Sequence, residues 1–166
     1  MFLVKKIITT KRFGAASAFL GTIFLSLLLF VWPNLHDYRQ ALLVYSSLNG
    51  NTSRMKLLFA LGADANEFEC QTANCWTPLY AAAAANQSEA VQLLLARGAD
   101  VNKKLKRGQT SLMIASYHGD IEMVRLLISS GADVNSDCEG ETALSFAKQK
   151  GHAELANLLI ATGASR

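Results

Sequence analysis

The chain has 166 residues, of which 51% are hydrophobic, and it carries 16 basic and 13 acidic side chains. Four of the basic side chains precede an apolar stretch near the N-terminus, which leaves 12 basic against 13 acidic side chains elsewhere. This near-neutral balance speaks against a nucleic-acid-binding surface, which requires a strongly basic domain. The ~130 residues after the stretch suffice for one hydrophobic core.

The apolar stretch over residues 13–32 contains no charged side chain. As a helix, its 20 residues span about 30 Å, the thickness of the hydrocarbon core of a bilayer. Trp32 stands at the far edge, where an indole favours the membrane interface, and Pro33 ends the helix. We therefore predict a basic segment over residues 1–12 and an uncleaved transmembrane signal anchor over residues 13–32.

Two other interpretations of this stretch are weaker. A cleaved signal peptide has a shorter core followed by small residues, whereas residues 28–32 are all bulky. A buried helix of a soluble protein would need more surrounding protein than the rest of the chain offers. Because excess Lys and Arg stays cytoplasmic, the basic residues before the span place the remainder of the chain outside, in the periplasm of a bacterium or a eukaryotic lumen. We favour a bacterial inner membrane.

Small residues recur at helical spacing along the predicted span, at Gly14, Ser17, Ala18 and Gly21. Such ridges let membrane helices pack closely, although small residues are common in membrane helices generally. The ridge is a candidate contact with a second helix in the bilayer.

A five-residue phrase recurs after the span, at residues 62–66, 98–102 and 131–135, and a shorter copy, Gly163-Ala164, closes the chain. The intervals are 36, 33 and 32 residues. A threonine precedes the glycine by 21 residues in three copies, at Thr77, Thr110 and Thr142. This period predicts a stack of small units that bury their apolar faces against one another.

The pattern resembles the ankyrin repeat, which reads G-x-T-P-L-H-x-A, then G-H, then L-L-x-x-G-A-D-V-N; residues 77–82 are its closest copy. The resemblance implies an all-α helical solenoid in which a β-hairpin loop and two antiparallel helices form each repeat. It covers a domain over 36–166, with repeats at about 36–66, 72–102, 105–135 and 137–166. The first copy lacks the hairpin and is expected to cap the stack, with Leu42, Leu43 and Tyr45 as its apolar contacts.

Individual residues fit this pattern, except in the histidine column. The threonines suit helix N-caps, and the glycines at 62, 98 and 131 suit helix ends with positive φ. The family's histidine after T-P-L is replaced by Tyr80, Met113 and Ser145, which puts the inter-repeat hydrogen bonds of that histidine in doubt.

The cysteines are expected to serve structure. Cys70 and Cys75 lie in the only insertion of the array, and we predict a disulfide between them, given the expected external topology. Cys138 is left over as a free thiol. Two cysteines without a nearby histidine supply half the ligands of a structural zinc site, so no metal site is expected.

The sequence contains no G-x-S-x-G, H-E-x-x-H, P-loop or G-x-G-x-x-G motif. His152 occupies the family's G-H column and is expected to be structural, and His118 is a surface contact. We therefore predict no enzyme, no cofactor, no small-molecule substrate and no nucleic acid.

Partner contacts in the family come from hairpin tips and the exposed side of each first helix. Those columns here hold Asn74, Trp76, Lys106, Arg107, Gln109, Tyr117, His118, Glu139, Glu141, Gln149 and Lys150. Large aromatic groups commonly anchor interfaces, and a basic hairpin beside an acidic one would orient a partner. The alternatives are that Trp76 packs beneath the enlarged loop and that the charges are simply solvated.

The resulting functional prediction is a protein–protein interaction module held by a single membrane span on the outer face of a membrane. In a sharper version the module caps or inhibits a partner in the same compartment. The alternative is a small structural subunit of a membrane complex that is recognised mainly through its transmembrane helix.

Overall fold

The structure, a computed structural model, describes residues 38–68 and 75–165. The chain divides into two units, Met1–His36 and Asp37–Arg166, and every described residue belongs to the second. The predicted basic segment, span and small-residue ridge (Gly14, Ser17, Ala18, Gly21) lie outside the described residues, as do Cys70 and Asn74. Within the described ranges, no helix is both long and apolar enough to cross a membrane.

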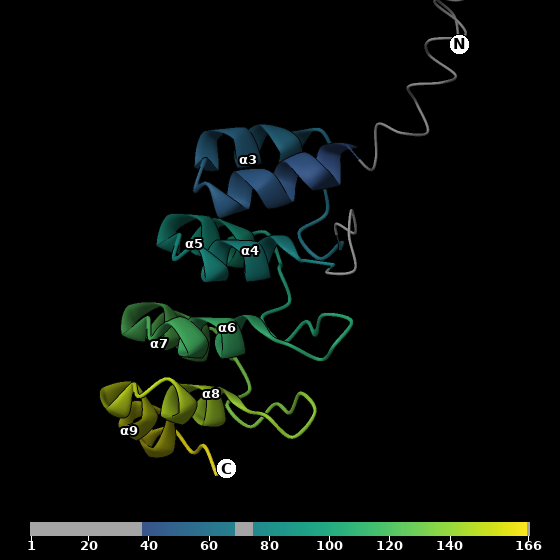
Figure 1. Ribbon diagram of the computed structural model, residues 1–166. Helices are drawn as coiled ribbons and strands as arrows, with labels where there is room; N and C mark the ends of the chain where they lie inside the picture. Colours follow the sequence, from purple (N-terminus) through teal and green to yellow (C-terminus); the bar gives the residue numbers. More distant parts are fainter. Residues whose placement is uncertain (1–37, 69–74, 166) are drawn as a thin grey trace, which may run out of the picture. The chain divides into compact units, whose positions relative to one another are not determined.

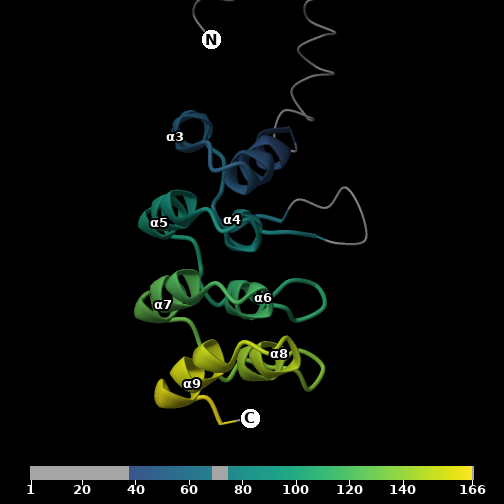
Figure 2. The same ribbon diagram turned by 60° about the vertical axis from the view of Figure 1, so that its left-hand side comes forward.

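The second unit is built from paired helices. An unlabelled helix over residues 38–48 precedes α3 (Thr52–Ala60), α4 (Pro78–Ala84), α5 (Ser88–Ala96), α6 (Ser111–His118), α7 (Ile121–Ser129), α8 (Ala143–Gln149) and α9 (Ala153–Ala161). Each pair lies on the next along the stack, and the loops between pairs project to one side (Figures 1 and 2). Helix α6 contacts both α4 and α8. The prediction of an all-α solenoid is confirmed for this part of the chain.

The predicted caps set the helix boundaries. Thr77 Oγ1 accepts the backbone N–H of Tyr80 at 3.1 Å, and Thr110 Oγ1 accepts that of Met113 at 3.4 Å. The threonine of the last repeat does the same within a capping box. Each hydroxyl pairs one of the orphan donors at a helix N-terminus. At the other end, Gly98 and Gly131 have φ of +81° and +90°, a region that only glycine adopts without strain.

In the two loops that the structure describes, the predicted β-hairpins are tight turns without regular strands, and an isolated antiparallel bridge closes the second. Cys138 and Glu141 exchange both backbone hydrogen bonds at 2.9 Å, and the N–H of Leu105 donates to the carbonyl of Gln109 at 2.8 Å. These pairs close the two described loops without a regular strand in either. Each of these loops is therefore closed at its base by backbone hydrogen bonds.

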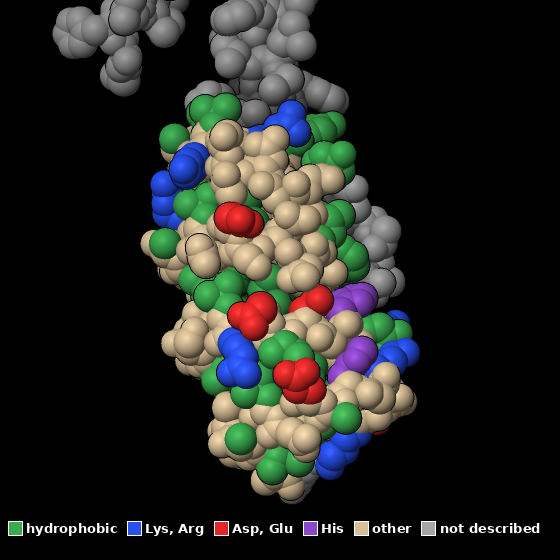
Figure 3. Space-filling model, turned by 90° about the vertical axis from the view of Figure 1, so that its left-hand side faces the viewer, with side chains coloured by type: hydrophobic (Ala, Val, Ile, Leu, Met, Phe, Trp, Pro, Cys, Tyr) green, Lys and Arg blue, Asp and Glu red, His purple; other side chains and the backbone are tan. Residues whose placement is uncertain are grey.

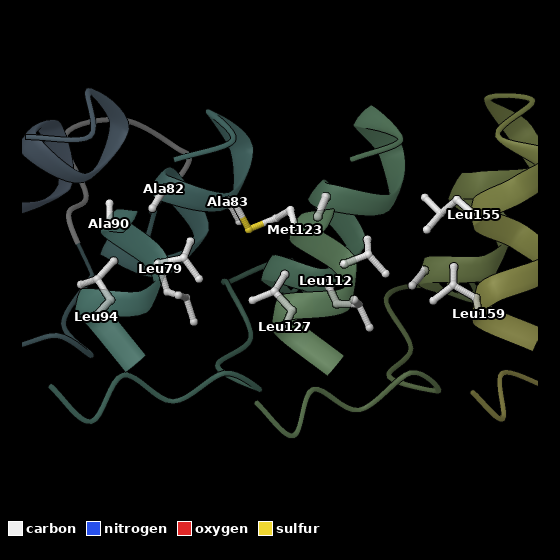
Figure 4. Packing of buried hydrophobic residues seen from close by; sticks show 14 of the residues in the cluster. Leu79, Ala82, Ala83, Ala90, Leu94, Leu112, Met123, Leu127, Leu155 and Leu159 are labelled. Carbon is white, nitrogen blue, oxygen red and sulfur yellow. The ribbon is translucent and has the colours of Figure 1, made fainter. Parts of the chain in front are cut away.

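The core is a column of leucines that repeats with the period of the chain. Two adjacent leucines precede each recurring glycine by five and four residues. The second leucine of each pair is buried, with exposed fractions of 5% or less, at Leu58, Leu94, Leu127 and Leu159. Figure 4 shows Leu94, Leu127 and Leu159 in equivalent positions along the stack, with Met123 reaching toward Ala83 of the preceding repeat. Burying one such side chain contributes about 1.5–3 kcal/mol, so the stack is held by interfaces between neighbours.

The first repeat departs from the prediction. Leu43 is fully buried as expected, but Leu42 and Tyr45 are 41% and 58% exposed, so their assignment as apolar core contacts is wrong. Leu57 is also 60% exposed, whereas the corresponding leucines of later repeats pack against the core. Each later repeat packs on a preceding one, whereas no layer before the first repeat is among the described residues.

A row of asparagines joins the repeats and makes inter-repeat hydrogen bonds without the missing histidine. Asn102 Nδ2 donates to the carbonyl of Gly131 at 3.0 Å, and the N–H of Asp133 donates back to Asn102 Oδ1 at 2.8 Å. Asn66 and Asn135 make the equivalent pairs with the layers that follow them. Gln40 reaches Asp64 in the same two-way manner. This ladder fixes the spacing of the layers along the loop side.

Candidate functional site

An apolar hollow lies across three successive first helices. It has a volume of about 190 Å³ and is lined by Tyr80, Gln109, Met113, Ile114, Tyr117 and Phe146. We call this set of six residues the cleft. Tyr80 comes from α4, the next four residues from α6 and the turn before it, and Phe146 from α8. Tyr80 and Met113 are 6% and 2% exposed and are therefore held by surrounding packing, while Tyr117 is 38% exposed at the rim.

Aromatic contacts hold the walls of the cleft. The ring of Trp76 lies 5.7 Å from that of Tyr80, with a 53° tilt, and the Tyr117 ring meets Phe146 edge-on at 6.2 Å. His118 contacts Tyr117 edge-on at 5.3 Å, and Lys150 Nζ stands 4.1 Å from the centre of the Tyr117 ring. Such pairs favour offset and edge-on geometries and add to the stabilisation from burial. These contacts hold Tyr117 at the rim of the cleft, with the Lys150 ammonium over its ring.

Two loop tips of opposite charge lie side by side. The Sγ–H of Cys138 donates to the carbonyl of Arg107 at 2.8 Å, and Lys104 Nζ donates to the carbonyl of Asp137 at 3.3 Å. These bonds bring the basic tip, with Lys106 and Arg107, against the acidic tip, with Glu139 and Glu141. All four of these charged side chains are exposed.

The thiol of Cys138 and the phenol of Tyr80, which lie between the loop tips and the cleft, are not activated groups. Cys138 is free and buried; burial, and next the carboxylate of Glu139, raises the pKa of its thiol. Burial also raises the pKa of the Tyr80 hydroxyl, with Cys138 adding to the rise. Because a nucleophilic cysteine needs a lowered pKa, this thiol serves packing and hydrogen bonding.

The two described histidines are surface and packing groups. His152 Nε2 lies 3.2 Å from the carbonyl oxygen of Tyr117 in the preceding repeat, which agrees with the structural role predicted for it. His118 is exposed beside Tyr117. Figure 3 shows both side chains following one another along one edge of the stack, with Lys or Arg side chains beyond them. Across residues 38–68 and 75–165, no three His, Cys, Asp or Glu side chains gather as metal ligands.

Comparison with known proteins identifies the fold. The family model described as ankyrin repeats in three copies matches residues 14–105 and again residues 98–165. The chain belongs to the ankyrin repeat family. The first match begins inside the apolar stretch, so the family match and the predicted span overlap over residues 14–32.

A curated relative shares part of this ankyrin repeat array. The chain is 40% identical over 73 residues to the 2-5A-dependent ribonuclease of Mus musculus, covering 44% of this chain and 10% of that protein. The chain spans about a tenth of the length of that relative. That ribonuclease is therefore a much longer protein, and the activity in its name is said of that protein and not of this chain.

Nine of the eleven predicted contact residues fall into two groups in this ankyrin repeat protein. Gln109 and Tyr117 line the cleft, and Trp76, His118 and Lys150 contact residues that line it or stand at its rim. The charged loop residues Lys106, Arg107, Glu139 and Glu141 form the paired tips. Gln149 is exposed at the end of α8, and Asn74 lies outside the described residues.

Four cleft residues are not among the predicted contacts. Tyr80 and Met113 occupy the column of the family's histidine, where the sequence shows only a departure from the family pattern. Ile114 and Phe146 share a column with Ala81, where the second repeat is small. Large side chains in one repeat facing small ones in the next produce a hollow, and comparing side-chain size down each column would have indicated it.

Proposed function

We propose that this ankyrin repeat protein is a membrane-tethered module that docks another protein at the cleft and the paired loop tips. An ankyrin repeat array is a non-catalytic protein–protein interaction module, and the observation that carries the proposal is the cleft itself. It is apolar, walled by fixed aromatic side chains and rimmed by polar and charged groups, as in the centre of a typical interface.

The tether rests on the sequence of residues 1–33. A charge-free stretch preceded by four basic residues favours a span with the repeats outside the cytoplasm. Tethering would raise the local concentration of the module beside partners in the same compartment, which suits a protein that caps or inhibits a secreted or membrane-bound partner. In that oxidising setting Cys75, which is buried, and Cys70 would form the predicted disulfide.

Removing residues 1–33 tests the two parts of this proposal separately. We expect the remaining fragment to leave the membrane fraction and still to capture the partner that the full chain captures. The full chain should expose its repeats to a non-permeant protease added from the extracytoplasmic side. A full chain that stays in the soluble fraction would overturn the tether while leaving the docking module intact.

A second function is favoured by the small-residue ridge from Gly14 to Gly21. In this alternative the span recognises a membrane complex and the repeats only cover it. Replacing Gly14 and Gly21 with leucine separates the two. Loss of the partner in that variant, together with retention in a cleft variant, would favour the structural subunit.

A further inference from the structure

The size and the rim of the cleft indicate what kind of partner fits it. We propose that the cleft receives one aromatic or large aliphatic side chain of the partner, and that Lys150 pairs with a carboxylate adjacent to that side chain. The inference rests on the proposed docking function and adds the chemistry of the segment that is bound.

The volume fits a single ring. An apolar protein cavity of about 150 Å³ stays dry and binds benzene, and the cleft has a volume of about 190 Å³. Five of its six lining residues present apolar or aromatic surface, and only Gln109 is an amide. Because almost all of the exposed lining surface is apolar, a polar or charged group seated here would lose water and gain few partners, which favours an apolar occupant.

The walls favour a flat, rigid occupant. Phe146 and Tyr117 already meet edge-on at 6.2 Å, and Tyr80 is held by Trp76 at 5.7 Å on the other side. A ring entering between them finds aromatic edges and faces at fixed positions. Aromatic side chains also lose few rotatable bonds when they are immobilised, which is why they recur as interface anchors.

The cation at the rim selects the neighbouring residue of the partner. Lys150 Nζ stands 4.1 Å from the centre of the Tyr117 ring, so the ammonium is held beside the mouth of the cleft. At the start of the same repeat, the carboxylate of Glu141 accepts a hydrogen bond from the hydroxyl of Ser145. A carboxylate on the partner is thus attracted toward Lys150 at the mouth of the cleft.

Selection from a random peptide display library against the full chain in nanodiscs tests this inference. We expect the enriched peptides to share a Phe, Trp or Leu within two residues of an Asp or Glu. Ile114→Asp should weaken their binding at least tenfold, because it places a charge in the cleft. The matched control Ile160→Asp alters an isoleucine that is 51% exposed on α9 and should leave binding unchanged.

Lys150→Glu provides the second readout. This variant changes an exposed side chain, so it tests the inference even if Ile114→Asp loses helical content. Selection against it should replace the acidic position of the enriched motif by Lys or Arg.

Several results would overturn the inference: no enrichment, a motif without the apolar–acidic pair, or binding that changes with neither Ile114→Asp nor Lys150→Glu. If peptides or the natural partner bind but depend on Lys106 and Arg107 instead, the docking module stands and only this assignment of the cleft fails. A natural partner captured equally well by wild type, cleft variants and loop-tip variants would contradict the proposed function itself.

Discussion

Asn102→Ala should weaken the joint between two central repeats without touching the hydrophobic core. The side chain of Asn102 makes two hydrogen bonds to the following repeat, to the carbonyl of Gly131 at 3.0 Å and from the N–H of Asp133 at 2.8 Å. All three residues are exposed, so water can replace the lost partners. The substitution therefore removes net hydrogen-bond energy and leaves no buried polar group unpaired.

The expected magnitude follows from these two bonds. A protein hydrogen bond contributes about 0.5–1.5 kcal/mol net, and exposure places each of these in the lower part of that range, for a total of about 1–2 kcal/mol. With a urea m-value of about 2 kcal/mol per molar, the unfolding midpoint should fall by about 0.5–1 M. Asn66→Ala should behave alike, whereas Asn135→Ala should cost less because it holds only the C-terminal turn.

The assay is urea unfolding of the full chain in detergent, followed by circular dichroism at a helical wavelength. Asn157→Ala on the exposed side of α9 is the matched control; alanine is the better helix former there, so the midpoint should stay or rise slightly. If Asn102→Ala unfolds at the same urea concentration as this control, the asparagine ladder does not join the repeats and the account of their spacing is wrong.

Three further outcomes are expected. Leu127→Ala, at a fully buried position, should lower the free energy of unfolding by about 2–5 kcal/mol, and a loss below about 1 kcal/mol would contradict the layered core. Gly119→Ala should destabilise the protein more than Gly131→Ala, although both glycines have positive φ. A Cβ at position 119 would lie 2.6 Å from the His152 ring, whereas a Cβ at position 131 would meet nothing within 4 Å. Equal shifts of the melting temperature would argue against the His152 contact. The pKa values of Cys138 and Tyr80 are raised in the folded state, so their contribution to the free energy of unfolding should be fully present at a pH below their ordinary pKa values and be lost as the pH rises through the raised pKa values. Iodoacetamide should accordingly label Cys138 more slowly at pH 8 in the native protein than in urea. Equal labelling rates would refute the protection of this thiol.

The repeating elements are predictable from the sequence because each has a local physical cause. A threonine hydroxyl caps the N-terminus of a helix, and a glycine adopts the left-handed conformation after its C-terminus without steric strain. Both effects act within a few residues of the chain. The leucine pairs repeat with the same period, so the period alone is enough to place the buried column. Only the first repeat misleads, since Leu42 and Tyr45 fit the pattern locally but are 41% and 58% exposed, with no preceding layer among the described residues.

The cleft is harder to predict because it depends on three repeats at once. Gln109 and Tyr117 stand out in variable columns, but Tyr80, Met113, Ile114 and Phe146 look like ordinary core residues within their own repeats. Their exposure is decided by the size of the side chain in the adjacent layer. The asparagine ladder is likewise visible in the sequence only as a repeated letter, because its hydrogen bonds join residues 28–34 positions apart.

The most direct test of docking at the cleft is quantitative co-purification from native membranes with wild type, Ile114→Asp and Ile160→Asp at equal expression. The account predicts one protein whose recovery falls at least tenfold with Ile114→Asp and is unchanged with Ile160→Asp. Equal recovery with all three chains, at unchanged helical content, would contradict it.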